Sequence, residues 1–209
     1  MKILIAGTLA GNGGIQSHMR WLSKALSEED FEVFAVSLGS PHGLPVDEVS
    51  LKTFWNNNVH LHCCTIHEND CKSRQFSGLR RLQELVKVID EFNPDIYLAI
   101  GTGWNLFLPP LLAHAKPIRI FHEVMSGVPS GWKDSRWCVK LWFDEVVGQS
   151  EIVSHTFSKE FGWKNQVSAL PALPEPLEVT ASLPKVELIR VAKGTIKAAL
   201  FSRLAPHKQ

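Results

Sequence analysis

This sequence has no large excess of charge of either sign and no long apolar run. Its 22 Lys and Arg residues oppose 21 Asp and Glu residues, which gives a formal net charge of +1, and no long basic run occurs. This balance argues against duplex nucleic acid as a partner. No apolar stretch reaches the roughly 18 residues that would cross a bilayer. The first seven residues are a short apolar segment with a single charge that ends in glycine. This pattern is typical of a buried strand and not of a secretory signal.

Cysteine is scarce, and internal repeats and low-complexity tracts are absent. The four cysteines show no framework spacing, so we expect free thiols and a cytoplasmic location. An apolar content of 44% and a charged content of 21% are ordinary for a globular protein. Disulfide scaffolds, fibrous repeats and disordered chains are therefore excluded.

The sequence does contain a regular alternation of strand and helix signals. An apolar strand at 2–6 precedes an amphipathic helix at 15–26, and the same two patterns then repeat. Further strands are expected at 31–38, 59–66, 96–100, 118–121, 144–148 and 166–170, and further helices at 79–89, 106–114 and 151–162. This order predicts an α/β fold: a Rossmann-like, doubly wound and mainly parallel sheet.

The pattern changes near residue 174, after a cluster of prolines. We predict a Rossmann-like domain at 1–173 and a linker or crossover at 174–194. Residues 195–209 contain a new apolar strand and are predicted to begin a second domain that is truncated here.

A glycine-rich turn joins the first strand to the first helix. Its backbone N–H groups, with the positive end of the helix, suit an anion at Gly13 and Gly14. The turn matches neither the dinucleotide fingerprint, because Gln16 replaces its third glycine, nor the P-loop. A plain tight turn is the competing interpretation.

Other candidate residues follow predicted strands. Gly103 and Trp104 come after 96–100, and His122 and Glu123 come after 118–121. Open α/β sheets bind ligands outside the carboxyl ends of their strands. We therefore expect one depression to be lined by Gly13, Gly14, Gly103, Trp104, His122 and Glu123. The alternative is a histidine whose hydrogen bonds are satisfied within a loop.

Two further clusters have other interpretations. The residues His60, His62, Cys63, Cys64, His67 and Cys71 are of metal-ligating types. Their spacing matches no zinc finger or knuckle, and we expect no metal site, although a strand would place His60, His62 and Cys64 on one face. The tryptophans between 132 and 142 are typical of core and surface anchors, or of an acceptor-binding or peripheral membrane patch.

Several motifs, taken together with their order and spacing, resemble the N-terminal half of a family 4 glycosyltransferase of GT-B architecture. The motifs are Gly11 to His18, Pro94-Asp95-Ile96, His122, Val147 to Glu151, and Ser202-Arg203-Leu204 with Lys208. The last matches the family pattern G-R-L-x-x-x-K-G except for Ser202 in place of glycine.

The resemblance implies a retaining transfer from a nucleotide-diphosphate sugar to a glycan, lipid or small-molecule acceptor, with no metal or other cofactor. It implies that His122 contacts the donor sugar near the reacting carbon and that the glycine loop approaches the donor. It also implies that Arg203 and Lys208 neutralise the diphosphate, whose negative charge grows as it leaves. The acceptor would bind mainly to the first domain.

The family's paired glutamates lie in the second domain and are absent from these 209 residues. We therefore predict that this chain alone does not transfer sugar. One alternative is a stand-alone Rossmann-like module that binds a small anionic ligand. A nicotinamide-dependent oxidoreductase is disfavoured by Gln16 and by the lack of an acidic residue at 36–39.

Overall fold

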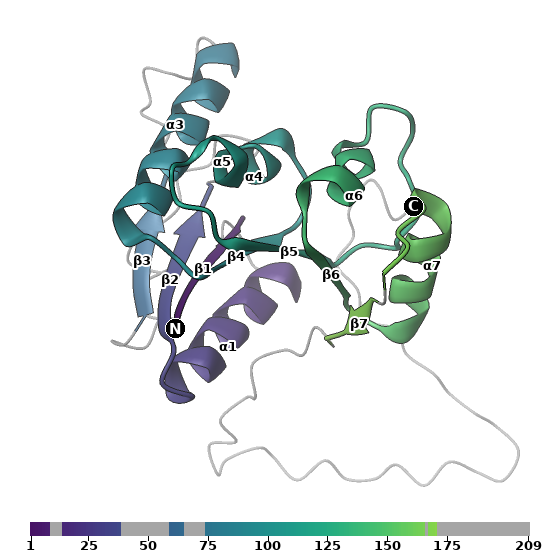
Figure 1. Cartoon of the computed structure of the whole chain (residues 1–209), viewed down its shortest axis with the longest axis horizontal. Helices are drawn as coiled ribbons and strands as arrows, with labels where there is room; N and C mark the ends of the chain where they lie inside the picture. The colour runs from purple at the N-terminus through teal and green to yellow at the C-terminus, as the bar shows by residue number, and fades with distance from the viewer. Residues whose placement is uncertain (9–13, 39–58, 65–73, 166, 171–209) are drawn as a thin grey trace, which may run out of the picture. The chain divides into compact units, whose positions relative to one another are not determined.

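A computed structural model describes residues 1–8, 14–38, 59–64, 74–165 and 167–170. Within them, seven parallel strands form one sheet in the order β3-β2-β1-β4-β5-β6-β7 (Figure 1). The strands are β1 (Lys2–Gly7), β2 (Glu32–Ser37), β3 (Val59–Cys63), β4 (Ile96–Ile100), β5 (Ile118–Glu123), β6 (Glu145–Gly148) and β7 (Ser168–Ala169). The predicted α/β fold with a mainly parallel sheet is confirmed.

The helices lie close to their predicted positions. They are α1 (Gly14–Glu28), α3 (Arg74–Phe92), α4 (Trp104–Phe107), α5 (Pro109–Leu112), α6 (Val139–Trp142) and α7 (Glu151–Phe161), with a 3-10 turn η2 (Ser135–Cys138). The single helix predicted at 106–114 is instead two short helices that meet at Leu108, because Pro109 begins the second one. None of the described helices is long and apolar enough to cross a membrane.

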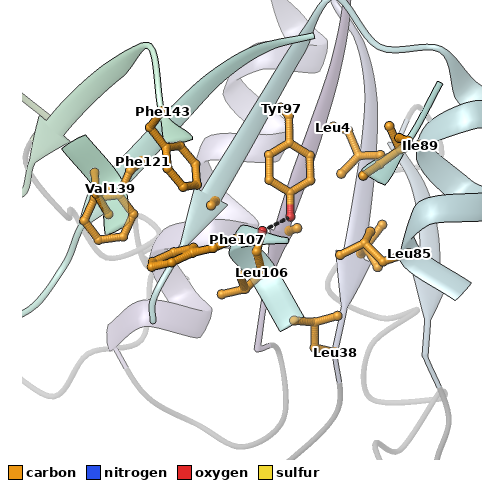
Figure 2. Packing of buried hydrophobic residues seen from close by; sticks show 14 of the residues in the cluster. Leu4, Leu38, Leu85, Ile89, Tyr97, Leu106, Phe107, Phe121, Val139 and Phe143 are labelled. Atoms are coloured by element: carbon orange, nitrogen blue, oxygen red, sulfur yellow. Dashed lines mark hydrogen bonds between the residues drawn. The ribbon is translucent and has the colours of Figure 1, made fainter. Parts of the chain in front are cut away.

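Strand alternation sends neighbouring side chains to two separate cores. Ile3 and Ile5 of β1 pack with Met19 of α1 on one face. Leu4 packs with Leu85 of α3 on the other face, where α4 and α5 also lie (Figures 1 and 2). Because both faces are covered, the central strands β1 and β4 are apolar along most of their length.

One buried polar group on the second face is satisfied by the backbone. The Tyr97 hydroxyl of β4 donates to the carbonyl of Leu106 at 2.8 Å and so ties the strand to α4 (Figure 2). The helix α7 begins and ends at the residues that the sequence predicts. Ser150 Oγ accepts from the Val153 N–H, and Gly162 adopts a left-handed φ of 67°.

The predicted linker and second domain lie outside the described residues, as do Gly13, Arg203 and Lys208. Their predicted roles stay predictions.

Candidate functional site

The carboxyl end of β5 meets the first turns of α1. His18 lies four residues after Gly14, about one helical turn along α1. Its Nε2 is 2.9 Å from Nε2 of His122, and neither side chain is exposed. We call His18 and His122 the histidine pair.

Sheet geometry explains why His122 faces α1. His122 pairs in register with Ile100 of β4, so their side chains share a face. Ile100 packs in the same core as Met19 of α1. The next residue, Glu123, therefore points to the opposite face.

Hydrogen bonding fixes where the protons of the histidine pair reside. His122 Nδ1 lies 2.9 Å from the Val147 carbonyl, which can only accept, so Nδ1 carries a proton. In a neutral ring, Nε2 of His122 is then an acceptor. It receives the Nε2–H of His18, and Nδ1 of His18 is left as a lone-pair acceptor.

Burial keeps both rings neutral. Loss of solvent, with a smaller contribution from His122, lowers the pKa of His18 to about 4. Burial also lowers the pKa of His122, although the hydrogen bond to Val147 opposes that shift. His18 Nδ1 is buried and has no hydrogen-bond partner among the described residues. The site therefore contains one uncharged, buried acceptor that has no partner among the described residues and that a hydroxyl or N–H would satisfy.

Glu123, on the other face, belongs to a charged cluster. Its Oε2 accepts from Arg136 at 2.8 Å, and its Oε1 accepts from the Met125 N–H at 2.6 Å. Arg136 also binds Asp134 at 2.6 Å and lies over the Phe161 ring at 5.0 Å. We call Glu123, Asp134 and Arg136 the Arg136 brace.

The brace fixes the segment between β5 and η2. Arg136 and Glu123 side chains are 2% and 0% exposed, and Arg136 also donates to the Val128 carbonyl. Burial opposes ionisation of Asp134, but hydrogen bonds from Arg136 and Ser130 outweigh it and lower the pKa of the carboxyl. This arrangement does not place Glu123 in the same depression as His122, contrary to the sequence-based expectation, because strand alternation separates them.

Gly103 and Trp104 lie just past the carboxyl end of β4, as predicted. Gly103 has a φ of 142°, a backbone conformation that favours glycine. Trp104 is 47% exposed and packs edge-on against Trp142, with ring centroids 5.7 Å apart. Of the predicted site residues, His122 contacts His18, Gly14 lies about one helical turn before His18 on α1, and Gly103 and Trp104 follow the neighbouring strand.

Sequence reasoning missed His18 as a site residue. Its position one turn after the glycine-rich turn, on the buried stripe of α1, was the available signal, because that stripe must face the sheet. A buried histidine on such a stripe needs a polar partner.

Solved structures of nucleotide-sugar enzymes share this topology. UDP-GlcNAc 2-epimerase from Methanocaldococcus jannaschii is 15% identical, with a TM-score of 0.56 over 81% of this chain and 45% of that one. MurG from Acinetobacter baumannii is 14% identical, with a TM-score of 0.56 over 83% of this chain and 46% of that one. The chain has the fold of one half of a GT-B protein.

A third similar structure is the apo form of the lipopolysaccharide outer core galactosyltransferase WaaB. It is 13% identical, with a TM-score of 0.55 over 81% of this chain and 45% of that one. The chain thus spans about half the length of the structures it resembles. No protein-family model and no curated protein matches the sequence.

Proposed function

We propose that this chain is the acceptor-side half of a retaining, nucleotide-sugar-dependent glycosyltransferase that resembles family 4. The observation that carries the proposal is the histidine pair, where β5 and α1 meet at the carboxyl edge of the sheet. That edge is where α/β sheets bind ligands. The sequence motifs supplied the family resemblance, and the GT-B-like fold supports it.

The neutral state of the pair suits a role in orienting a sugar. An uncharged imidazole held at both nitrogens neither repels nor protonates a neutral hydroxyl. His122 is fixed by Val147 and His18, and the open Nδ1 acceptor of His18 matches a hydroxyl donor. We assign His122 to positioning the donor sugar near its reacting carbon. The Val147 carbonyl sets the tautomer of His122, which in turn sets that of His18.

Stabilisation of the departing diphosphate is assigned to Arg203, Lys208 and the loop at Gly13 and Gly14. Cationic groups and backbone N–H donors suit the growing negative charge. No metal or other cofactor is assigned to the transfer itself. We propose that the acceptor is a glycan, a lipid or a small molecule.

We propose a cytoplasmic enzyme, and exposed apolar groups support its contact with a membrane surface. Trp132 is 83% exposed and Leu141 is 74% exposed. Lys133 lies 4.8 Å from the centroid of the Trp132 ring. Aromatic and basic side chains together favour the interface of an anionic bilayer.

The test compares this 209-residue chain with the product of the complete reading frame, using a panel of labelled nucleotide-sugars and acceptors. We expect transfer with retained anomeric configuration by the complete product and no turnover by the 209-residue chain. In the complete product, His122→Ala should lower kcat by about 100-fold, because one preorganised contact is lost. The effect of His18→Ala should be smaller.

The matched control is His155→Ala, which removes an exposed histidine of α7 and should leave kcat unchanged. Conversion of UDP-GlcNAc to its C2 epimer without an acceptor would show an epimerase instead. A reading frame that ends at Gln209, combined with tight binding of a small anion, would favour the stand-alone binding module.

A further inference from the structure

A second cluster of chemically capable side chains lies away from the histidine pair, between β3 and α3. His62, Cys64 and Glu84 each offer one ligand atom, and these atoms all lie within 4.8 Å of one another. His62 Nε2 is 2.7 Å from Glu84 Oε1. We propose that these three residues bind one divalent metal ion of the zinc type.

The fold brings the three side chains together. His62 and Cys64 are two residues apart, so an extended chain sends both to the same face of the sheet. His62 pairs in register with Val36, whose face is covered by α3. Glu84 is the neighbour of Leu85, which anchors α3 in that core. The Cys64 N–H donates to the Ser37 carbonyl at 2.9 Å and fixes the backbone beside the thiol.

The donor set selects the class of metal. One imidazole nitrogen, one sulfur and one carboxylate oxygen are the ligand types that Zn²⁺ takes in proteins. Mg²⁺ and Ca²⁺ prefer oxygen ligands throughout, so the thiol and imidazole disfavour them. A thiolate at Cys64 and a carboxylate at Glu84 would balance the two positive charges of the ion. A neutral site is needed here because the Cys64 side chain is only 1% exposed.

Metal binding replaces protons. Without metal, the close contact between His62 and Glu84 holds one proton between the two atoms, and we place it on Nε2 of His62. On binding, that proton moves to Nδ1 or, from a doubly protonated ring, leaves to solvent, and the nitrogen lone pair binds the metal. The Cys64 S–H bond breaks, its proton leaves to solvent and a sulfur–metal bond forms. Affinity should therefore rise with pH.

The site has room to adjust and to hold a fourth ligand. Ligand atoms around a tetrahedral zinc lie about 3.3–3.7 Å apart, given bonds of about 2.0–2.3 Å, so His62 and Glu84 must separate slightly. Both side chains are 35% exposed and line a cavity of about 500 Å³. A water molecule from that cavity would complete the shell. The metal would tie β3, which among the described strands pairs only with β2, to α3.

Metal-ligand spacing in the sequence could not identify this site. The spacing rules describe ligands carried on one short motif, whereas Glu84 lies 22 residues after His62 on a different element. The expectation that no metal binds rested on those rules. The inference is independent of the proposed transferase activity.

The test is a titration of the full 209-residue chain with Co²⁺, a spectroscopic substitute for Zn²⁺, in a phosphine reductant. We expect one equivalent to bind, with a thiolate-to-cobalt absorption band and the strong visible bands of a tetrahedral site. Zn²⁺ should displace the cobalt and raise Tm, since the metal binds only the folded chain. Cys64→Ser should abolish the thiolate band, and His62→Ala and Glu84→Gln should weaken binding about tenfold or more.

Two matched controls separate this site from chance binding. Cys138→Ser removes a second cysteine, which is partly exposed. His114→Ala removes a histidine whose Nδ1 lies 3.0 Å from Asp90 Oδ2, a surface histidine–carboxylate pair. Both variants should bind Co²⁺ as the parent does.

Absence of a thiolate band, or a band retained in Cys64→Ser, would overturn the proposal. Because Cys64 is buried, its variant is checked for folding by circular dichroism. Glu84 is partly exposed and Glu84→Gln is conservative, so that variant should fold. Equal Co²⁺ affinity for Glu84→Gln and the parent would also overturn the proposal.

Discussion

Two buried polar clusters sit one residue apart on β5, and they differ in charge and in completeness. The histidine pair on the α1 face is neutral and leaves Nδ1 of His18 without a partner among the described residues. The Arg136 brace on the opposite face is ionic, and both carboxylates are bonded. Adjacent residues of one strand thus belong to two different environments.

The difference separates a binding role from a structural one. A buried ion pair whose carboxylate oxygens already accept hydrogen bonds from the protein does not need a ligand, and it costs much to break. In the neutral pair, one buried acceptor receives no hydrogen bond from the described residues, and a ligand could supply it. Position at a strand end therefore identifies a region, while the contacts decide which side chain is available.

The largest effect should come from breaking the brace. Arg136→Met leaves Glu123 and Asp134 without their cation, and removing one partner of a buried pair costs about 3–5 kcal/mol of unfolding free energy. Urea denaturation measures the loss. Lys133→Met, beside it but exposed, is the control and should change stability by less than about 0.5 kcal/mol. A small loss in Arg136→Met would show that the two acids tolerate burial alone.

Acid should affect the two clusters in different pH ranges. The pKa of His18 is about 4 in the folded chain against 6.5 ordinarily. The unfolded chain therefore binds a proton that the folded chain excludes, and stability falls as pH drops from about 6.5 to about 4. The expected loss is about 3 kcal/mol, from a shift of about 2.5 pKa units.

Within the brace, Asp134 should respond only at lower pH. Because the pKa of Asp134 is lowered from 3.8, its stabilising effect is present above 3.8 and is lost as pH falls below it. The measurement is urea unfolding of the parent and of His18→Gln between pH 7 and pH 4.5. This range covers the titration of His18 and lies above the range in which Asp134 responds. The variant should lose the part of the slope that His18 contributes, while the part from His122, whose pKa is also lowered, remains. An unchanged slope would contradict the neutral assignment of His18.

A smaller loss of stability is expected when Gly148, which lies beside both clusters, is replaced. Gly148 pairs with Glu123 and follows Val147, the acceptor for His122. A Cβ there would overlap Ser154 Oγ and lie 2.9 Å from the Ser154 nitrogen of α7. Gly148→Ala should cost about 1–3 kcal/mol in urea denaturation, as overpacking does.

Gly14→Ala provides the matched comparison for that glycine. Apart from its chain neighbours and the backbone of α1, no described residue has an atom within 4 Å of a Cβ at Gly14, which begins α1. We expect its stability to change by less than about 1 kcal/mol. Equal losses in the two variants would show that close packing of α7 is not the reason for glycine at 148.

Most of the described fold could be predicted because its signals are local. The apolar strand at 2–6 and the stripe of α1 follow from periods of two and 3.6 residues, and Ser150 and Gly162 mark the ends of α7. Proline at the start of α5 was a local signal that the prediction at 106–114 did not use.

Only part of the candidate site could be predicted. His122 and Gly14 were identified because strand ends and glycine turns are visible in the sequence. His18 was missed, and Glu123 was grouped with His122, because partners 104 and 13 residues away decide their roles. No local pattern contains such pairings.

The sequence by itself determined the alternation of elements and which residues of one strand share a face, since these depend on neighbours within a few positions. Tertiary structure decided that His122 meets His18, that Glu123 meets Arg136 and that Glu84 meets His62. Those contacts depend on strand register and helix packing. Burial against the chosen partner then sets whether each group is charged, neutral or open to a ligand.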